Sequence, residues 1–482
     1  MRRLPLTLLI VVNVCWLMPA LALEQPQAQA GNPKLEFIQV SRDGGHFVLS
    51  GSGSEFRPWG FNYDHDAANR LLETYWKEEW SAVAGDFEEM KQLGANTVRV
   101  HLQVSRFMKS AEETNRESLE LLARLLALAQ KTALYLDITG LGCYDKKDVP
   151  RWYNDLSEAQ RWDVQARFWA AVAATCNHSP AVFCYDLMNE PVVTEDKKSR
   201  DWTPGAFGDR YFVQRLTLDF AGRSEKQIAK AWVDKLVAAI RRHDRQHLVT
   251  VGAIPWAMTW PNAKPLFYSK EVSKNLDFVS LHFYPRKGEV GKALKALTVY
   301  NIGKPMVIEE MFPLNCSVAD MDQFIEGSKP MACGWIGFYW GKTIAEYKRE
   351  KGSIADAITL DWLEYFVRKT PDILGPMATQ KADRQGKRQV RTVSRQSPRA
   401  RAKCLGTAPL PPPPARWGRP GELNWWSCGN PAGRPRAFAV PGTPSCRGCY
   451  SARRHERAHF RLPNFATLAI LLRRPWRWYQ EQ

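Results

Sequence analysis

Short apolar segments alternate with amphipathic segments along most of the chain. From Trp59 onward, eight apolar runs of strand length recur, and most are continuous rather than alternating between apolar and polar residues. Continuous apolar runs are typical of parallel strands that are buried on both faces. The eight runs end at Asn62, His101, Ile138, Glu190, Gly252, Tyr284, Glu310 and Trp340.

Segments with helical periodicity lie between these runs. They are Glu78–Leu93, Glu117–Ala129, Glu158–Thr175, Glu225–Arg241 and Ile354–Arg368. The interval between the fifth and sixth runs contains Pro255, Pro261 and Pro265, so we expect a short or displaced helix there. Eight strands alternating with helices predict an α/β fold, specifically a (β/α)₈ TIM barrel. An open dinucleotide-binding sheet is disfavoured because no Gly-x-Gly-x-x-Gly motif follows the first run.

The chain divides into four predicted parts. Residues 1–22 resemble a signal peptide, with two arginines, an apolar stretch and small residues at a cleavage site, so we expect a secreted or periplasmic protein. An uncleaved membrane anchor is the alternative. Residues 23–45 are predicted to be a linker. Residues 46–375 form the predicted barrel domain, which begins with a hairpin of 46–50 and 56–59, and residues 376–482 form an Arg/Pro-rich tail.

The net charge of +17 belongs entirely to the tail, since residues 381–482 contain 18 Arg and 3 Lys against 4 acidic residues. The rest of the chain is electrically balanced, and we expect no nucleic-acid binding by the predicted barrel. Three interpretations of the tail stay open: an arm for anionic polymers, a carbohydrate-binding module, or sequence read in a shifted frame. Its composition predicts disorder in each case.

We expect no cofactor, no metal site and no disulfide framework, and a monomer. The predicted barrel holds five cysteines, an odd number whose pairing the sequence leaves open. Asp64-His65-Asp66 has metal-binding residue types, but such a cluster more often binds sugar hydroxyls or caps a loop. In the tail, Cys446 and Cys449 precede His455 and His459 at a spacing too short for a zinc finger.

Two carboxylates end otherwise apolar runs, Glu190 on the fourth and Glu310 on the seventh. Functional residues of a (β/α)₈ barrel gather at the carboxyl ends of its strands, so both acids should point into one cleft. Hydrolysis of a glycosidic bond requires such a pair, one protonated and one ionised. The alternative is that both acids form structural ion pairs.

The chain resembles glycoside hydrolase family 5, the cellulase family of clan A, from about Arg57 to Thr370. The motifs that carry the resemblance lie on the predicted strands in order: Arg99, Asn189-Glu190-Pro191, His282-Phe283-Tyr284, Val307-Ile308-Glu309-Glu310 and Trp340. Asn-Glu-Pro alone is moderately specific, and the ordered set is much more so.

The resemblance implies a retaining O-glycosyl hydrolase of the endo-glucanase or mannanase type, with carboxyls about 5–5.5 Å apart. Glu190 would be the acid/base and Glu310 the nucleophile, kept ionised by Arg99 and Tyr284. Asn189 would bind the sugar 2-hydroxyl, His282 would line the cleft, and Trp340 would form the floor under the sugar ring. The substrate would be a β-linked glucan or mannan. Alternatives are transglycosylation or glycolipid cleavage on the same fold, and a non-catalytic carbohydrate-binding barrel.

Two positions qualify the resemblance. Glu309 competes with Glu310 for the nucleophile role, and because adjacent strand residues face opposite sides, we expect one of them in the cleft, Glu310. The doubled glutamate is reminiscent of the family's mannanases. Family members often carry His at the end of the third strand, where this chain has Asp137-Ile138-Thr139-Gly140.

Aromatic residues on the predicted catalytic face are candidate sugar platforms. Trp202 follows the fourth strand, and Trp256 and Trp260 follow the fifth. Core packing is an equally good interpretation of each. The long segment from Val192 to Arg223 is a candidate cleft wall or lid.

Overall fold

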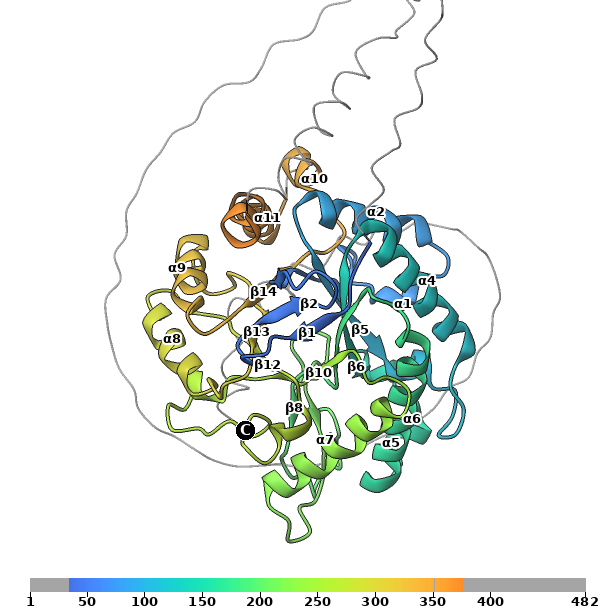
Figure 1. The fold of residues 1–482 in the computed structure, drawn as a ribbon. Coiled ribbons are helices and arrows are strands. Elements are labelled where there is room, and N and C mark those ends of the chain that lie inside the picture. Colours follow the sequence, from blue (N-terminus) through green and yellow to red (C-terminus); the bar gives the residue numbers. More distant parts are fainter. Residues whose placement is uncertain (1–33, 351, 376–482) are drawn as a thin grey trace, which may run out of the picture. The chain divides into compact units, whose positions relative to one another are not determined.

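The fold is a closed barrel of eight parallel strands, seen along its axis in Figure 1, in a computed structural model that describes residues 34–350 and 352–375. The fifth strand is interrupted at one residue, Val251, so that β10 pairs with β7 and β11 with β12, which closes the sheet. The predicted fold class is therefore confirmed. In chain order the barrel strands are β4 (Trp59–Asn62), β5 (Thr97–Gln103), β6 (Tyr135–Gly142), β7 (Val182–Asp186), β10 (Leu248–Thr250) with β11 (Gly252–Ala253), β12 (Val279–His282), β13 (Met306–Glu310) and β14 (Gly334–Phe338).

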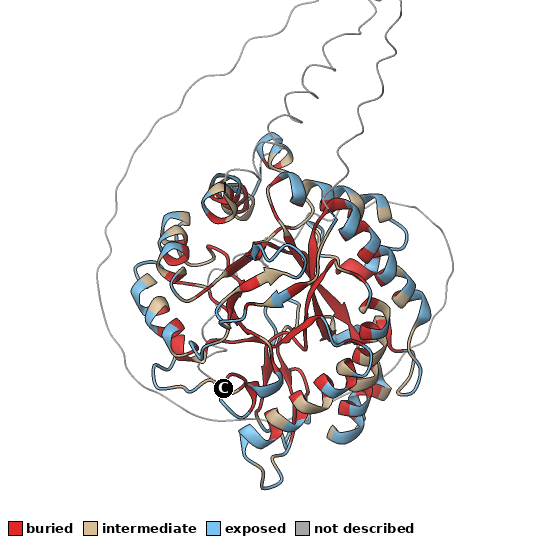
Figure 2. Ribbon diagram, viewed as in Figure 1, coloured by how far each residue is buried: buried red, intermediate tan, exposed pale blue. Residues whose placement is uncertain are grey.

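Helices surround the barrel, with buried faces toward the strands and exposed faces outward (Figure 2). Five of them begin with a reciprocal capping box that satisfies the first free backbone N–H groups, at Ser157, Ser224, Ser317, Thr343 and Ser353. The α-helices are α1 (Leu72–Tyr75), α2 (Trp80–Gln92), α3 (Val104–Phe107), α4 (Arg116–Thr132), α5 (Arg151–Asn154), α6 (Glu158–Cys176), α7 (Glu225–Arg241), α8 (Val290–Thr298), α9 (Val318–Ser328), α10 (Ile344–Arg349) and α11 (Ile354–Leu374).

The connection after the fifth strand has no α-helix, as its prolines predict. Two short 3₁₀ helices, η2 (Trp256–Met258) and η3 (Ser273–Asn275), take its place. Another 3₁₀ turn, η1 (Lys146–Asp148), precedes α5. The segment after the fourth strand contains β8 (Pro191–Val192) paired in parallel with β9 (Gln214–Arg215).

A small antiparallel sheet covers the amino-terminal end of the barrel. It consists of β1 (Ile38–Val40), β2 (Phe47–Leu49) and β3 (Glu55–Phe56). Ile38, Phe47 and Phe56 pack against residues at the starts of barrel strands, among them Phe183 and Phe278. The predicted hairpin thus exists, but the predicted linker (23–45) extends too far, because Ile38 is a buried core residue with a strand partner.

The fourth strand ends earlier than predicted. Regular pairing stops at Asp186, although the amide of Glu190 still donates to the carbonyl of Gly252 at 2.8 Å. The φ angle of Glu190 is +47°, a left-handed conformation that a strand cannot contain and that costs a non-glycine residue about 1 kcal/mol. The backbone therefore leaves the extended strand conformation at Glu190, the predicted acid/base.

Several sequence-based predictions lie outside the described residues. These are the signal peptide (1–22), most of the linker and the tail (376–482). Within the described part, the five cysteines Cys143, Cys176, Cys184, Cys316 and Cys333 are free thiols. No helix in this part is long and apolar enough to cross a membrane.

Candidate active site

The predicted site residues all lie at the carboxyl-terminal end of the barrel. Arg99 lies within β5, His282 ends β12 and Glu310 ends β13, whereas the others follow a strand within four residues. Six of them form one network of hydrogen bonds and ion pairs: Arg99, Asn189, Glu190, His282, Tyr284 and Glu310. The structure therefore brings together residues that are separated by up to 211 positions in the sequence.

The two predicted catalytic carboxylates face each other. A carboxylate oxygen of Glu190, one of Glu310 and a ring nitrogen of His282 all lie within 4.8 Å of one another. Both glutamates are 8% exposed, so each keeps a small opening toward the outside of the protein. Two carboxyls this close can act on the same glycosidic bond, one at its oxygen and the other at its carbon.

Arg99 organises the site from inside the barrel. Its Nη1 donates to Glu310 Oε1 at 2.6 Å, and its Nη2 donates to Asp186 Oδ2 at 2.7 Å and to Asn189 Oδ1 at 3.0 Å. Burial alone would lower the pKa of Arg99, but Glu309, Asp186 and Glu310 raise it well above its usual value. A permanently charged guanidinium with several fixed donors is suited to holding carboxylates in defined positions.

Glu310 is held on both of its carboxylate oxygens. Arg99 bonds Oε1, and the Tyr284 hydroxyl donates to Oε2 at 2.6 Å. Both hydrogen bonds are short, and together they fix the carboxyl group in one orientation. The geometry matches that required of a nucleophile with a fixed orientation.

His282 connects the two sides of the site. Its Nδ1 lies 3.0 Å from Glu190 Oε1 and its Nε2 lies 3.4 Å from Glu309 Oε2. Burial alone would lower the pKa of His282, but the charge of Glu310 and the hydrogen bonds with Glu190 and Glu309 raise it to about 10. The imidazole therefore carries a positive charge at neutral pH.

The premise that the paired glutamates face opposite sides of β13 is wrong, although Glu310 is partly exposed, as the prediction requires, and Glu309 is not. Glu309 is fully buried and its Oε2 lies 3.5 Å from Arg99 Nη2, while Glu310 lies at the same guanidinium. The reason is a bulge: Ile308 pairs with Leu281, but His282 pairs with Glu310. The extra residue in β13 breaks the alternation of side chains, so that both acids point inward at different depths.

Sequence reasoning missed Asp186 and Gly252. The Asp186 carboxylate accepts from Arg99, from Thr139 Oγ1 at 3.0 Å and from the Gly252 amide at 2.6 Å. A Cβ at Gly252 would lie 2.7 Å from Glu309 and 2.8 Å from His282, which is closer than real contacts allow. Position 252 must be glycine for the site to pack. Asp186 ends an otherwise apolar strand four residues before Glu190. An acid at the end of an apolar strand is the sequence feature that could have identified it.

The end of the third strand, Asp137-Ile138-Thr139-Gly140, has no histidine, and the second strand contributes His101. His101 Nδ1 lies 2.7 Å from the Tyr144 hydroxyl, and its Nε2 lies 3.2 Å from Asn62 Oδ1. Burial and the charge of Arg99 hold the pKa of His101 well below its usual value, so this ring is neutral.

Trp340 follows β14, which is separated by β13 from the strand that ends with His282. Its indole stacks on the His65 ring, with centroids 5.5 Å apart, and packs on Phe312 and Phe338. His65 is in turn paired with Asp64 at 2.9 Å. Asp66 accepts the amides of Ala68 and Arg70, which is the loop-capping role considered for this cluster.

The three candidate platforms differ. Trp202 is buried, and its Nε1 donates to the Asn154 carbonyl, so it is a packing residue. Trp260 is 43% exposed and its ring lies 5.2 Å from that of the partly buried Trp256. This pair remains a candidate platform. The predicted cleft wall reaches the site, since Asn189 Nδ2 donates to the Phe212 carbonyl.

Two groups of described residues have the geometry of metal ligands. They are Glu190 with His282 and Glu310, and Asp137 with Cys184 and Glu309. Arg99 lies beside a carboxylate of each group, and burial holds the pKa of the Cys184 thiol well above its usual value. The positive charge that these carboxylates need is thus already supplied by protein groups.

Comparison with known proteins gives the following similarities. Residues 59–343 match the family model described as Cellulase (glycosyl hydrolase family 5). The exo-β-1,4-mannosidase Op5Man5 from Opitutaceae bacterium strain TAV5 has a similar fold, with a TM-score of 0.51 and 16% identity over 71% of this chain and 63% of that one. The alignment thus spans less than two thirds of the mannosidase.

Two further solved structures have lower TM-scores and nearly complete coverage of their own chains. The β-1,4-mannanase from the common sea hare Aplysia kurodai has a TM-score of 0.48 and 14% identity over 71% of this chain and 99% of that one. The catalytic domain of Thermobifida fusca endoglucanase Cel5A has a TM-score of 0.44 and 14% identity over 69% of this chain and 97% of that one. A search of the curated proteins finds no match.

Proposed function

The chain belongs to the cellulase family, glycosyl hydrolase family 5, and is an O-glycosyl hydrolase; on this premise we propose that it cleaves a β-linked glucan or mannan with retention of configuration. The observation that carries the proposal is the approach of Glu190 and Glu310, whose carboxylate oxygens come within 4.8 Å. Retaining enzymes hold their two carboxyls about 5–5.5 Å apart, because no water has to fit between nucleophile and sugar.

In the proposed first step, Glu310 attacks the anomeric carbon while Glu190 gives its proton to the leaving oxygen. The products are a glycosyl ester on Glu310 and the free leaving alcohol. In the second step, Glu190 takes a proton from a water molecule whose oxygen attacks the anomeric carbon and releases Glu310. The bonds from Arg99 and Tyr284 support this assignment, since they fix the Glu310 carboxylate in one orientation.

The remaining site residues have proposed roles toward the sugar. Asn189 is oriented by Arg99 and Phe212, and its second amide hydrogen is proposed to bind the 2-hydroxyl. Trp340 is proposed to stack under the ring at the cleavage point, because the C–H face of a sugar packs well on an aromatic face. The doubled Glu309-Glu310 supports a mannan over a glucan. The amino-terminal sequence supports export from the cytoplasm.

A stereochemical assay on polysaccharides tests the proposal. The purified protein is incubated with β-glucans and β-mannans, and the anomeric configuration of the first products is followed by NMR. We expect β-configured products on at least one of these polymers, formed by wild type and not by Glu310→Ala. Products with the α configuration first, or equal hydrolysis by both proteins, would refute the mechanism.

A further inference from the structure

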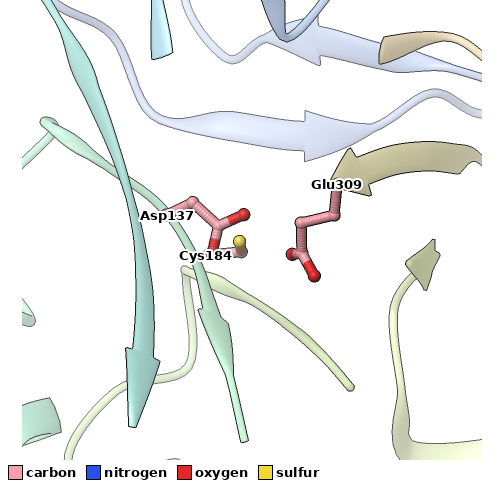
Figure 3. A group of neighbouring side chains, drawn as sticks. All are labelled: Asp137, Cys184 and Glu309. Atoms are coloured by element: carbon pink, nitrogen blue, oxygen red, sulfur yellow. The ribbon is translucent and has the colours of Figure 1, made fainter. Parts of the chain in front are cut away.

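A second cluster of titratable side chains lies in the barrel beneath the catalytic pair. Asp137 of β6, Cys184 of β7 and Glu309 of β13 are buried, and one oxygen or sulfur atom of each lies within 4.8 Å of the others. Figure 3 shows the carboxyl groups of Asp137 and Glu309 directed toward each other with Cys184 between them. The proposed hydrolysis gives this cluster no role.

If both acids are ionised, the Cys184 thiol, a weak donor, is the group of this cluster that can donate to them. Both oxygens of Asp137 and Oε1 of Glu309 are inaccessible to water, and among the described residues no strong donor outside the cluster bonds to them. Unpaired buried carboxylate oxygens are costly. One proton on Asp137 removes the problem, since the carboxyl group can then donate to Glu309.

Electrostatics place that proton on Asp137. Burial and the negative charge of Glu309 raise the pKa of Asp137 well above its usual value. Burial would also raise the pKa of Glu309, but Arg99 and hydrogen bonds with His282 and Asp137 lower it. Of the two acids, Glu309 is the ionised one.

Glu309 connects the buried cluster to the catalytic acid through one ring. Its Oε2 lies 3.4 Å from Nε2 of His282, whose Nδ1 lies 3.0 Å from Glu190 Oε1. An ionised Glu309 can only accept a hydrogen bond, so Nε2 must carry a hydrogen. The Nδ1 atom is then left to face Glu190.

We propose that Asp137 is protonated and donates to ionised Glu309, and that Glu309 is a positioning residue which holds His282 with Nε2–H toward itself and Nδ1 toward Glu190. The inference rests on the proposed function in that Glu190 is taken as the acid/base. When Glu190 has given its proton to the leaving group, the charged His282 donates from Nδ1 to the new carboxylate. When Glu190 is protonated again, the ring stays in place because Glu309 still binds it.

The charge balance around His282 agrees with this assignment. The groups that face the ring come from three strands and are Arg99 and neutral His101 of β5, Asp186 and the following Glu190 of β7, and Glu309 and Glu310 of β13. If Asp137 were also ionised, it would join Asp186, Glu190, Glu309 and Glu310 as the fifth buried carboxylate, against one arginine and one imidazolium. With a proton on Asp137 and the transferable proton on Glu190, three negative charges remain.

Histidine nitrogen NMR tests the protonation directly, without reference to activity. In wild-type protein labelled with ¹⁵N-histidine, the two His282 nitrogens should both show imidazolium shifts at pH 7; His282→Gln identifies the signals. Infrared difference spectra between wild type and Asp137→Asn should contain the carbonyl stretch of one buried protonated carboxyl group. A neutral His282, or the absence of that stretch, overturns the proposal.

Kinetics test the positioning role. Glu309→Gln removes the anion at Nε2, so the pKa of His282 should fall toward its usual value of about 6.5. A new basic limb should then lower kcat/KM by about tenfold or more between pH 6.5 and 8.5, relative to wild type. Glu73→Gln is the control, because Glu73 is also a buried carboxyl and its hydrogen bond comes from the Gln103 amide, not from His282. Equal profiles for the two variants overturn the proposal.

Conservative rescue separates hydrogen bonding from packing. Asn at position 137 can donate to Glu309 as the protonated acid does, so Asp137→Asn should keep the wild-type pH profile, while Asp137→Ala should shift it as Glu309→Gln does. Identical profiles for Asn and Ala overturn the proposal. If instead Glu190→Gln and Glu310→Ala remain fully active, the proposed function fails, while the NMR result on His282 still stands by itself.

Discussion

Glu309 and Glu310 are neighbours in β13, yet both side chains reach the guanidinium of Arg99, at 3.5 Å and 2.6 Å. The bulge in β13 makes this possible. Arg99 thereby binds both Glu310, the proposed nucleophile, and Glu309, whose side chain contacts His282. Replacing either glutamate with a neutral residue removes one of the negative charges that balance the buried guanidinium of Arg99.

Removing the proposed acid should affect substrates according to their leaving groups. We expect Glu190→Ala to lower kcat on polysaccharide about 10²–10⁴-fold, the range typical of general acid–base catalysis. Aryl glycosides with acidic phenols need no protonation, so their glycosylation step should lose much less. Azide, which needs no general base, should restore turnover and yield a β-glycosyl azide. Failure of azide to react would speak against the acid/base role.

The Tyr284 hydroxyl should matter for rate rather than for folding. Tyr284→Phe removes the donor to Glu310 Oε2, a charge-assisted bond of about 1.5–3 kcal/mol, so kcat should fall roughly 10–100-fold. Circular dichroism should show an unchanged Tm. Tyr300→Phe is the matched control, since its hydroxyl serves only the Ala257 amide in the core, and it should retain wild-type kcat.

Replacing Arg99 by lysine should destabilise the protein. The ammonium group cannot reach Glu310, Asp186 and Asn189 together, so buried carboxylates lose their partner. Breaking a buried ion pair costs about 3–5 kcal/mol. Urea unfolding should show a loss of this order, together with loss of hydrolysis. A variant as stable as wild type would mean that the site tolerates unpaired acids.

Glu73 should make stability depend on pH. Burial raises its pKa from 4.5 to about 7, so between these values the folded protein keeps a proton that the unfolded chain has lost. Raising the pH through this window therefore lowers the free energy of unfolding, by up to about 3 kcal/mol. Glu73→Gln keeps the acceptor for the Gln103 amide and should abolish this dependence. Urea unfolding at pH 5 and pH 8 measures it.

The exposed Trp260 should contribute to polymer binding. Aromatic contacts are worth about 0.5–1.5 kcal/mol, so Trp260→Ala should raise KM for a long substrate roughly 2–10-fold. An aryl monoglycoside does not extend to the segment after the fifth strand, and its KM should not change. An equal rise for both substrates would indicate a structural role next to Trp256 instead.

Strand-level patterning was sufficient to predict the barrel and the positions of the site residues. Continuous apolar runs predicted the eight strands, and the polar residues at the ends of most of these runs indicated the catalytic end. What the pattern could not show was departure from strand geometry. The positive φ of Glu190 and the bulge near Glu309 depend on contacts between strands that are distant in sequence.

The missed residues share a physical reason. Asp186 and Asp137 belong to strands whose other residues are mostly apolar, so an assumption of an apolar interior conceals them. Asp186 is accommodated because Arg99 and the Gly252 amide donate to it, and Asp137 because it is proposed to be protonated. Similarly, Ile38 was assigned to a linker because β1 and its partner strand β2 are short. The residues that bury Ile38 lie at the starts of barrel strands that are distant in sequence.

The small sheet β1–β3 has a practical consequence for protein production. Its side chains shield the aromatic cluster around Phe183 and Phe278 from solvent. A shortened chain that starts at the first barrel strand would expose those rings as a hydrophobic patch and would be prone to aggregate. Boundaries for expression should therefore be placed before Ile38, even though every residue of the proposed chemistry lies beyond Trp59.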